Sequence, residues 1–450
     1  METQPIRFYH RGQVQQVTDA PITRTVLQYL REDARCTGTK EGCAEGDCGA
    51  CTVVIGELQQ DGELSFKAVN SCIQFLPTLD GKALITVEDL RQADGSLHPV
   101  QEAMVECHGS QCGFCTPGFV MSLWALYQQH QPGGPAPDRQ TICDALTGNL
   151  CRCTGYRPII EAGQRMMSLP APHASRLEPK AIASALRTLM REDTFHYRDP
   201  SGALFHAPRT ASAFAALKAA EPSARILAGS TDVGLWVTKQ FRELGNLLYV
   251  GQVEDLQHVV EHDGVIEIGA AVSLERAYAA LNQAHPELEE LWKRFASLPI
   301  RNAGTLGGNI ANGSPIGDSM PALIALGPRS CCSIATRAAR CRSRTCTWPT
   351  RRPRWPRANS SRRCGCRCPG PSTSVPTSCP NGLTRTSRRS APPSASPSPT
   401  AWCARPASPS AAWRPRPSAR PTPRSRCSAS AGTKPPSRPR WPRCRRTTRR

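Results

Sequence analysis

The first chemistry-bearing feature of the chain is a set of cysteines spaced like metal ligands. Cys43, Cys48 and Cys51 follow the pattern C-x4-C-x2-C, and Cys72 follows after twenty intervening residues. Thiolates at this spacing hold a [2Fe–2S] cluster in plant-type sites. The residues between them are small, which lets backbone N–H groups approach sulfur and tune a cluster. Zinc or a redox disulfide is the alternative, although zinc sites more often use two C-x2-C pairs.

A second set of cysteines follows. The stretch SQCGFCTPG supplies Cys112 and Cys115, and NLCRCTGYRP supplies Cys151 and Cys153. By spacing alone these four could bind zinc. Both pairs fall at turns next to helical patterns, so the four side chains can converge at one end of a helix bundle. Next to a ferredoxin-like unit, we favour a second iron–sulfur centre over zinc.

Three further cysteines lie outside these patterns. Cys36, seven residues before Cys43, has no place in the first set, and we expect it not to be a ligand. Cys107 and Cys143 lie among apolar residues at helical spacing, as core cysteines do. We assign no acid, base or nucleophile to the chain, so no catalytic residue is predicted.

Short strands and one helix must position the first set. We expect two strands within 5–17, around a turn at Arg11-Gly12, and a helix over 24–33. Apolar residues rich in Val, Ile and Phe predict further strands. These strands lie within 51–58, 64–72 and 83–90. The result is a small mixed sheet with one helix.

Residues 99–167 change to helical spacing and predict an all-helical second unit. Thr116-Pro117 is a good N-cap and N1 pair for one helix. Asp138 can cap the next one. The second set of cysteines therefore belongs to the ends of helices.

The third unit, residues 194–327, mixes strands with helices and follows a linker over 168–193. Its stretch 225–239, RILAGSTDVGLWVTK, predicts a strand, a turn and a helix, and free N–H groups at such a turn suit a pyrophosphate. A second glycine-rich loop spans 301–323, where chain and ligand could approach closely. Neither loop is G-x-G-x-x-G, so a Rossmann fold is not indicated, and alone each could be a structural turn.

The charge of the chain divides it in two. The 450 residues carry a formal net charge of +20. Residues 328–450 hold 28 Arg and one Lys but no acidic residue, so residues 1–327 have a net charge of −9. This tail, rich in Arg, Pro, Ser and Cys, has no helix or strand period, and we expect it to be disordered. A basic nucleic-acid arm is one interpretation, but a frameshift, a gene read in the wrong frame, explains the composition better.

The chain shows no apolar signal segment and no stretch long enough to span a membrane. We therefore expect a cytoplasmic location, with no membrane and no nucleic acid as partner. In such a reducing compartment, clustered cysteines are metal ligands more often than disulfides.

Three motifs together resemble the molybdenum hydroxylases, the xanthine dehydrogenase and aldehyde oxidase family: TGTKEGCAEGDCGACTVV, HGSQCGFCTPGFVMS and NLCRCTGYRPI. The resemblance implies a β-grasp ferredoxin domain over 1–88 and a four-helix-bundle domain over 89–167, each with one [2Fe–2S] cluster. It also implies that Gln111 and Cys151 lie next to a molybdopterin held by another polypeptide. The implied cluster ligands are Cys43, Cys48, Cys51, Cys72, Cys112, Cys115, Cys151 and Cys153.

The two glycine-rich loops resemble the FAD-binding segments of the same family, whose flavin domain has a vanillyl-alcohol-oxidase-type α+β fold. This implies a multidomain α+β chain with an FAD domain over 194–327 that is incomplete at its C-terminal end. Phe295 would lie near the flavin ring and Asp318 at its polar groups. The other implied FAD contacts are Ile226, Leu227, Ala228, Gly229, Ser230, Thr231, Asp232, Val233, Thr305, Leu306, Gly307, Gly308 and Asn309.

Cluster domains and a flavin domain on one chain, with no molybdenum domain, resemble the small subunit of bacterial members of the family. The resemblance implies an oxidoreductase complex in which a molybdopterin-binding large subunit hydroxylates a purine, xanthine or hypoxanthine. Electrons would pass through two [2Fe–2S] clusters to FAD and then to NAD⁺. The alternatives are an aldehyde-oxidase-like subunit, a truncated two-cluster carrier without a flavin site, and a nucleic-acid-binding protein that acts through the tail.

Overall fold

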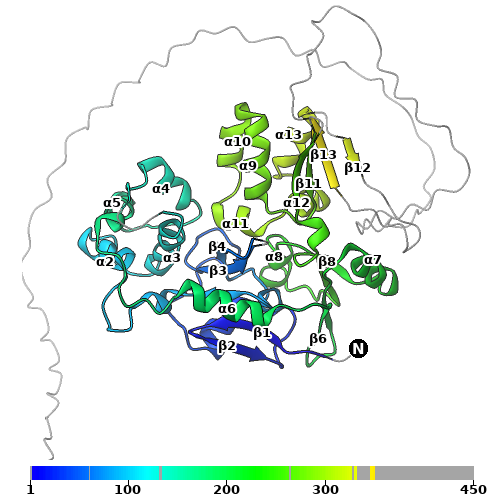
Figure 1. Cartoon of the computed structure of the whole chain (residues 1–450), viewed down its shortest axis with the longest axis horizontal. Helices are drawn as coiled ribbons and strands as arrows, with labels where there is room; N and C mark the ends of the chain where they lie inside the picture. Colours follow the sequence, from blue (N-terminus) through cyan, green and yellow to red (C-terminus); the bar gives the residue numbers. More distant parts are fainter. Residues whose placement is uncertain are drawn as a thin grey trace, which may run out of the picture. The chain divides into compact units, whose positions relative to one another are not determined.

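Figure 1 shows the computed structural model of the chain. It describes residues 3–59, 61–130, 134–262, 265–326, 329–331 and 345–349. The predicted tail, 328–450, lies outside the described residues apart from the last two of these stretches. All described residues belong to one compact part of the chain, Met1–Gly382, which includes the three units predicted from the sequence.

Near the N-terminus a mixed sheet has the strand order β2-β1-β5-β3-β4. β1 pairs with β5 in parallel and the other neighbours are antiparallel, as the predicted β-grasp domain requires. The predicted turn at Arg11-Gly12 joins β1 to β2, and φ is positive at both residues (52° and 79°), which suits a two-residue hairpin turn. The strands are β1 (Ile6–His10), β2 (Gln13–Val17), β3 (Thr52–Leu58), β4 (Leu64–Asn70) and β5 (Ala83–Ile85).

The helix predicted over 24–33 is present, but only its first turn is α-helical. Thr25 and Gln28 form a reciprocal capping box at its start. The helix α1 (Val26–Gln28) then widens into a π-helical turn, η1 (Tyr29–Asp33). The 3₁₀ turns of this domain are η2 (Leu76–Leu79) and η3 (Val87–Leu90).

The predicted helical unit follows, and its helix α3 contacts β3. Asp138 caps α4 as predicted, because its carboxylate accepts a hydrogen bond from Thr141 N (2.7 Å). The prediction that Thr116 caps α3 was wrong: Cys115 holds the N-cap position, and the Thr116 hydroxyl donates to Ser110 Oγ instead. The elements are α2 (Pro99–Glu106), α3 (Thr116–Tyr127), α4 (Arg139–Ala145), α5 (Arg157–Arg165) and the 3₁₀ turn η4 (Met166–Ser168).

Residues 168–193, predicted as a linker, contain a helix, α6 (Pro179–Leu189). Ile182, Leu186 and Leu189 lie on one face of it and are almost fully buried. They pack with Tyr9 and Ala83 of the N-terminal sheet. The helix α6 is therefore amphipathic, and its apolar face covers part of this sheet.

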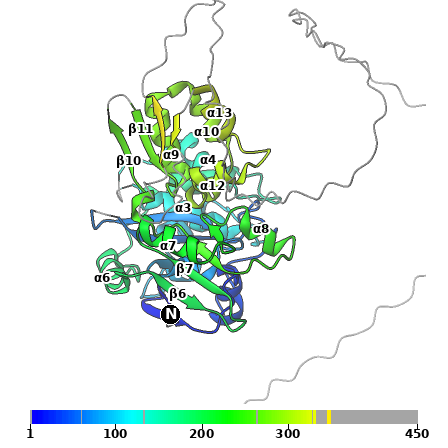
Figure 2. The same cartoon turned by 90° about the vertical axis from the view of Figure 1, so that its right-hand side faces the viewer.

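The third unit contains two further sheets. The first has the order β6-β7-β9-β8, with β7, β9 and β8 parallel. The second has the order β10-β11-β13-β12 and is antiparallel. Figure 2 shows β6, β7 and α7 from another side. The strands are β6 (Phe195–Arg198), β7 (Leu204–Ala207), β8 (Arg225–Leu227), β9 (Leu247–Tyr249), β10 (Val259–His262), β11 (Val265–Gly269), β12 (Arg329–Cys331) and β13 (Thr345–Pro349).

Short helices complete the third unit, and several lie in the glycine-rich segments singled out by the sequence. The α-helices are α7 (Ala211–Ala220), α8 (Val233–Thr238), α9 (Leu274–Ala284), α10 (Glu289–Arg294), α11 (Leu298–Ala303), α12 (Leu306–Asn312) and α13 (Ser319–Leu326). The 3₁₀ turns are η5 (Glu254–Leu256) and η6 (Pro286–Leu288). Among the helices that the structure describes, none has the length and apolar character needed to cross a bilayer.

The first and third units share one apolar core. Phe8 and Phe75 of the N-terminal domain belong to the same buried cluster as Phe195, Tyr197 and Phe205 of β6 and β7. The Tyr197 hydroxyl also donates to a backbone carbonyl of the N-terminal domain, that of Ala20. Their relative position is therefore fixed by burial of large side chains, the strongest stabilising contribution available to a protein.

The first and second units are in close backbone contact at glycine residues. A Cβ on Gly118, in the first turn of α3, would lie 2.1 Å from the carbonyl oxygen of Gly49. A Cβ on Gly49, which has a φ of +69°, would lie 2.3 Å from the carbonyl oxygen of Gly148. Backbone atoms cannot move aside as side chains do, so only glycine permits this approach.

We predict that Gly118→Ala separates the first two units. The added Cβ overpacks a contact limited by backbone, so the free energy of unfolding should fall by about 1–3 kcal/mol despite the better helix propensity of alanine. Denaturant unfolding followed by circular dichroism measures this loss. Gly163→Ala in α5 is the control, because its Cβ would meet only side-chain carbons of Ile142 and Leu123. Equal stability of the two variants would contradict the prediction.

Candidate functional site

Cys43 of the first set lies in a nest of backbone amides. Its sulfur accepts hydrogen bonds from the N–H groups of Glu45 (3.4 Å), Asp47 (3.4 Å) and Cys48 (3.3 Å). The loop can wrap round the sulfur because Ala44 and Gly46 are small and have positive φ (54° and 80°). Donors arranged in this way stabilise negative charge on sulfur.

The other members of the first set converge on the same place. Cys51 Sγ lies 3.2 Å from Cys72 Sγ, although the two residues are 21 positions apart. Hydrogen bonds with Cys48 and then Cys72, together with the backbone N–H donors, hold the pKa of Cys43 far below its ordinary value. The structure therefore brings together the four cysteines that the sequence predicts as one site, with Cys43 held as the thiolate that metal binding requires.

Apolar side chains shield the buried half of this site. Cys51 and Cys72 are 1% and 2% exposed. They pack with Ile73 of the same domain and with Leu235 and Ile300 of the third unit. Water is therefore kept from this side of the first set by residues of two domains.

Cys36 lies apart from the first set, as the sequence predicts for a residue that is not a ligand. Its sulfur is 3.7 Å from His10 Nε2 and 4.0 Å from Arg11 Nη1. The side chain is 2% exposed, and burial raises the pKa of its thiol. Cys36 therefore belongs to the sheet's own interior rather than to the amide nest.

The second set lies where the ends of α3 and α5 approach. Cys115 is the N-cap of α3, and Cys151 precedes the turn that leads into α5. Cys115 pairs with Cys151, and burial followed by this hydrogen bond raises the pKa of Cys115 to about 12. Cys151 Sγ is also within 3.2 Å of Thr154 Oγ1 and accepts from Thr154 N (3.4 Å). Burial opposes the shift, yet these hydrogen bonds lower the pKa of Cys151.

The remaining pair of the second set faces solvent. Cys112 and Cys153 are exposed. A hydrogen bond between them raises the pKa of Cys153, and a backbone N–H donated by Phe114, followed by Cys153, lowers the pKa of Cys112. Gln111 beside them is exposed as well. Cys107 and Cys143, by contrast, pack against the core of the helical domain, in line with the prediction.

The two sets are joined by a short backbone bridge. Leu150 N donates to the carbonyl oxygen of Cys48 (3.0 Å), and Leu150 directly precedes Cys151. Asn149 reinforces the bridge, because its Nδ2 donates to Gly49 O (3.2 Å) and Ser122 Oγ donates to its Oδ1 (2.8 Å). A predicted ligand of one set, Cys48, and a predicted ligand of the other, Cys151, are thus connected by a single hydrogen bond and a peptide.

The structure also brings the two predicted flavin segments together. A Cβ on Gly229 would lie 1.9 Å from Ala303 O, and a Cβ on Gly308 would lie 3.4 Å from Ala228 Cβ. Thr305 caps α12 by accepting from Gly308 N (3.0 Å). The run 226–233 therefore lies against the run 305–309, which the sequence alone could not establish.

Two polar side-chain atoms in these segments lack a hydrogen-bond partner in the part of the chain that the structure describes. Ser230 Oγ and Asn309 Oδ1 are buried and accept or donate no hydrogen bond among the described residues. Ser230 also has a φ of +63°, which is uncommon for a residue other than glycine. Because buried polar atoms are nearly always paired, these two atoms fit a polar ligand such as FAD at this place.

Phe295 and Asp318 lie near the second of these segments: Phe295 packs against the cluster that contains Leu306, and Gly317, next to Asp318, lies against Asn309. The Phe295 ring packs edge-on against Tyr278, with centroids 5.9 Å apart. Asp318 is exposed just before α13. Their predicted roles toward FAD remain predictions.

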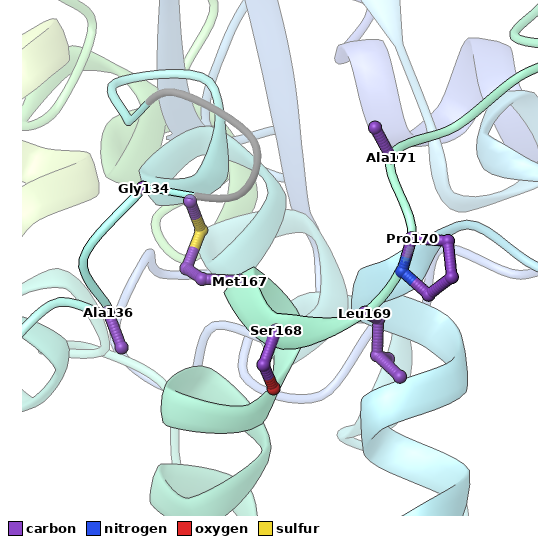
Figure 3. Close-up of a pocket in the computed structure, with 7 residues that line it drawn as sticks. All are labelled: Gly134, Ala136, Met167, Ser168, Leu169, Pro170 and Ala171. Atoms are coloured by element: carbon purple, nitrogen blue, oxygen red, sulfur yellow. The ribbon is translucent and has the colours of Figure 1, made fainter.

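A pocket of about 550 Å³ lies elsewhere, as Figure 3 shows. It is lined by η4 and the segment after it, and no predicted site residue lines it. The lining residues are Gly134, Ala136, Met167, Ser168, Leu169, Pro170 and Ala171. None of these side chains is titratable, so the pocket offers no chemistry.

The chemistry of the donor sets favours two-iron clusters. In the described part of the chain, no three His, Cys, Asp or Glu side chains converge as ligands of one metal ion. The thiols instead meet in pairs, Cys51 with Cys72 and Cys115 with Cys151. Backbone N–H groups donate to the sulfurs of Cys43 and Cys151. Four thiolates with amide donors are what a [2Fe–2S] cluster requires.

Sequence reasoning missed three residues other than cysteine that support the cysteine sets or their loops. Thr154 and Asn149 sit next to Cys151 in the sequence, so their positions in NLCRCTG could have drawn attention to them. Thr238 donates to Ala44 O (2.7 Å) from the third unit, and no local pattern announces that contact.

Family comparisons agree with this arrangement. The model of a "2Fe-2S iron-sulfur cluster binding domain" matches residues 8–75, and that of a "[2Fe-2S] binding domain" matches 86–164. The model of an "FAD binding domain in molybdopterin dehydrogenase" matches residues 196–340, which extends past the predicted boundary at 327. The chain therefore carries two [2Fe–2S]-binding domains and an FAD-binding domain, and the predicted cofactors are confirmed at the level of domains.

Two of the proteins that are similar to this chain are xanthine dehydrogenases. Xanthine dehydrogenase of Drosophila pseudoobscura pseudoobscura is 35% identical over 376 residues, which covers 73% of this chain and 28% of that protein. Xanthine dehydrogenase 1 of Arabidopsis thaliana is 33% identical over 377 residues, with 70% and 27% covered. Quinoline 2-oxidoreductase of Pseudomonas putida 86 is a similar solved structure, at 31% identity and a TM-score of 0.31, with 42% of this chain and 98% of that one covered.

The chain spans less than a third of the length of these xanthine dehydrogenases. In this chain two iron–sulfur domains are followed by a flavin domain. On this evidence the chain belongs to the molybdenum hydroxylase (xanthine dehydrogenase/aldehyde oxidase) family, as an iron–sulfur and FAD subunit.

Proposed function

We propose that this chain is the electron-transfer subunit of a molybdenum hydroxylase, specifically the small subunit of a xanthine dehydrogenase. The observation that carries the proposal is the bridge from Cys48 O to Leu150 N, which joins the two cysteine sets. On the other side of the first set lie residues of the flavin domain, Leu235 and Ile300. The three predicted cofactor sites therefore follow one another through direct contacts.

The residues of the chain hold and tune the carriers. Cys43, Cys48, Cys51 and Cys72 would bind one cluster, and Cys112, Cys115, Cys151 and Cys153 the other. When bound, the clusters supply one-electron transfer and FAD exchanges those electrons with a two-electron acceptor. The protein contributes amide donors at Cys43 and a hydroxyl donor at Cys151, which set how strongly each sulfur holds negative charge.

The exposure of the second cysteine set supports a direction for electron transfer through the three cofactor sites. The second set has two exposed thiols, and Phe114 and Leu150 beside it are exposed apolar side chains (48% and 51%). Exposed apolar residues around a potential redox site suit a partner surface. We propose that a molybdopterin-binding large subunit covers this face, so that electrons enter at the second set and leave through the flavin domain.

The substrate and acceptor follow from the names of the relatives. Since the similar full-length proteins are xanthine dehydrogenases, we propose a purine, xanthine or hypoxanthine, as the substrate of the large subunit. NAD⁺ is the proposed acceptor at FAD. A cytoplasmic location would keep the eight thiols reduced and available to iron.

A second candidate is a two-cluster carrier that does not retain FAD. It is favoured by one observation: the Phe295 ring packs in the apolar cluster around Tyr278, and the Asp318 side chain is exposed. Both candidates require the cysteines to bind two clusters, and they differ only in whether the chain binds FAD.

Cofactor analysis of the purified full chain tests the proposal. We expect about four iron and four acid-labile sulfide per chain, two distinct [2Fe–2S] signals in electron paramagnetic resonance, and one FAD. Two cluster signals without FAD would contradict the proposed subunit and favour the two-cluster carrier. Zinc in place of iron would contradict both candidates.

Exchange of single cysteines separates ligand from neighbour. Cys72→Ser should remove one [2Fe–2S] signal and its visible absorbance, because it takes away one of four thiolates at a converged site. Cys36→Ser is the matched control and should keep both signals, because Cys36 lies with His10 rather than with the first set. Loss of a cluster in Cys36→Ser would show that the ligand set is misassigned.

Gly229→Ala should release FAD while keeping both clusters. Its Cβ would lie 1.9 Å from Ala303 O and would push apart the two flavin segments. FAD content and the visible flavin spectrum measure the loss. Gly202→Ala is the control for backbone strain alone: its φ of +90° disfavours alanine, but its added Cβ would meet no described atom within 4 Å, so FAD should be kept. Full FAD content in Gly229→Ala would argue against a flavin site between these segments.

A further inference from the structure

The helix α8 of the flavin domain contacts the loop that carries the first cysteine set. Thr238, its last residue, donates a hydrogen bond from Oγ1 to the carbonyl oxygen of Ala44 (2.7 Å). The same hydroxyl lies 3.2 Å from the carbonyl of Gly234, one turn earlier in α8. A hydroxyl has one proton, and the shorter contact takes it, so Ala44 is the principal partner.

This hydrogen bond acts on the amide nest around Cys43. The carbonyl of Ala44 and the N–H of Glu45 belong to one planar peptide group, so fixing one fixes the other. That N–H donates to Cys43 Sγ (3.4 Å). Thr238 therefore holds, from another domain, the peptide that donates to a sulfur of the predicted cluster.

The peptide needs such support. Ala44 has a φ of +54°, a left-handed conformation that costs a residue with a Cβ about 1–2 kcal/mol. A conformation of this kind persists where surrounding contacts enforce it. The contact from Thr238 is well placed to do so.

Two further contacts keep α8 and the loop in register. A Cβ on Gly234 would lie 2.6 Å from Ile73 O, so α8 packs directly against the residue after Cys72. Lys239, just beyond α8, lies 3.5 Å from the Glu45 carboxylate, and both side chains are 42% exposed. The ion pair is exposed and weak, whereas the Thr238 hydrogen bond is partly buried and short.

We propose that Thr238 is a positioning residue that raises the reduction potential of the first iron–sulfur centre by holding the Glu45 N–H on Cys43. The inference rests on the proposed function, since it requires a cluster at the first set. An N–H donor stabilises the more negative, reduced state of a thiolate-bound cluster. Loss of the Thr238 hydroxyl lets the peptide turn away and makes reduction less favourable.

The test is a redox titration of the full chain followed by electron paramagnetic resonance, which resolves the two cluster signals. Thr238→Val keeps the shape of the side chain and removes the hydroxyl. We expect its first cluster to have a more negative midpoint potential, by up to about tenfold in the electron-partition constant, or about 59 mV for one electron. The second cluster, which Thr238 does not contact among the described residues, should keep its potential. Thr238→Ser retains the donor and should restore the wild-type value.

Lys239→Gln, at the residue that follows Thr238 at the end of α8, is the matched control. It removes only the exposed ion pair, so any shift it causes should vanish at high ionic strength, whereas the Thr238→Val shift should persist. An unchanged potential in Thr238→Val, or an equal shift of both clusters, would overturn the inference and leave the proposed function standing. Absence of a first-cluster signal in the wild-type chain would instead refute the proposed function itself.

Discussion

The carbonyl groups of Cys48 and Gly49 make the contacts on which the arrangement of the cysteines depends. The Cys48 carbonyl accepts from Leu150 N, and the Gly49 carbonyl accepts from Asn149 and lies against α3 at Gly118. A loop that must surround a metal centre thus also forms the boundary between two domains. Its N–H groups at Glu45, Asp47 and Cys48 donate to sulfur, whereas its carbonyls at Cys48 and Gly49 accept from the neighbouring domain.

The same arrangement, an N–H group directed at sulfur and a carbonyl directed at another domain, recurs at the other end of the loop. The Glu45 N–H points at Cys43 while the carbonyl of the same peptide points at Thr238 of the flavin domain. The first cysteine set therefore has one neighbour on each side, the helical domain through Cys48 and the flavin domain through Ala44. Small residues make both approaches possible, because a larger side chain in this loop would separate sulfur from its donors.

Much of the fold and the cysteine sets could be predicted because their causes are local. The hairpin at Arg11-Gly12, the cap at Asp138 and the spacing of Cys43, Cys48 and Cys51 all depend on near neighbours in sequence. The domains and their cofactors followed from motifs as well. Placement of the individual ligands and flavin contacts remains a prediction, supported by the pairing of sulfurs and by the juxtaposed glycine segments.

The misses arose where a tertiary contact decided the outcome. Cys115 took the cap of α3 because Ser110 attracted the Thr116 hydroxyl, and α6 formed because its apolar stripe found Tyr9 and Ala83. Asn149, Thr154 and Thr238 act across turns or domains. Single-sequence patterns contain no information on which distant surface a residue will meet.

The apolar core shared by the first and third units has a consequence for how such a chain can be divided in evolution. Phe195, Tyr197 and Phe205 are almost fully buried with the side chains of the N-terminal sheet. Expression of the two parts as separate polypeptides would expose these rings, at a cost of about 1.5–3 kcal/mol each, and would leave two adhesive surfaces. A gene fission between these domains would therefore demand new polar residues on both faces, whereas a fusion that keeps them in one polypeptide needs none.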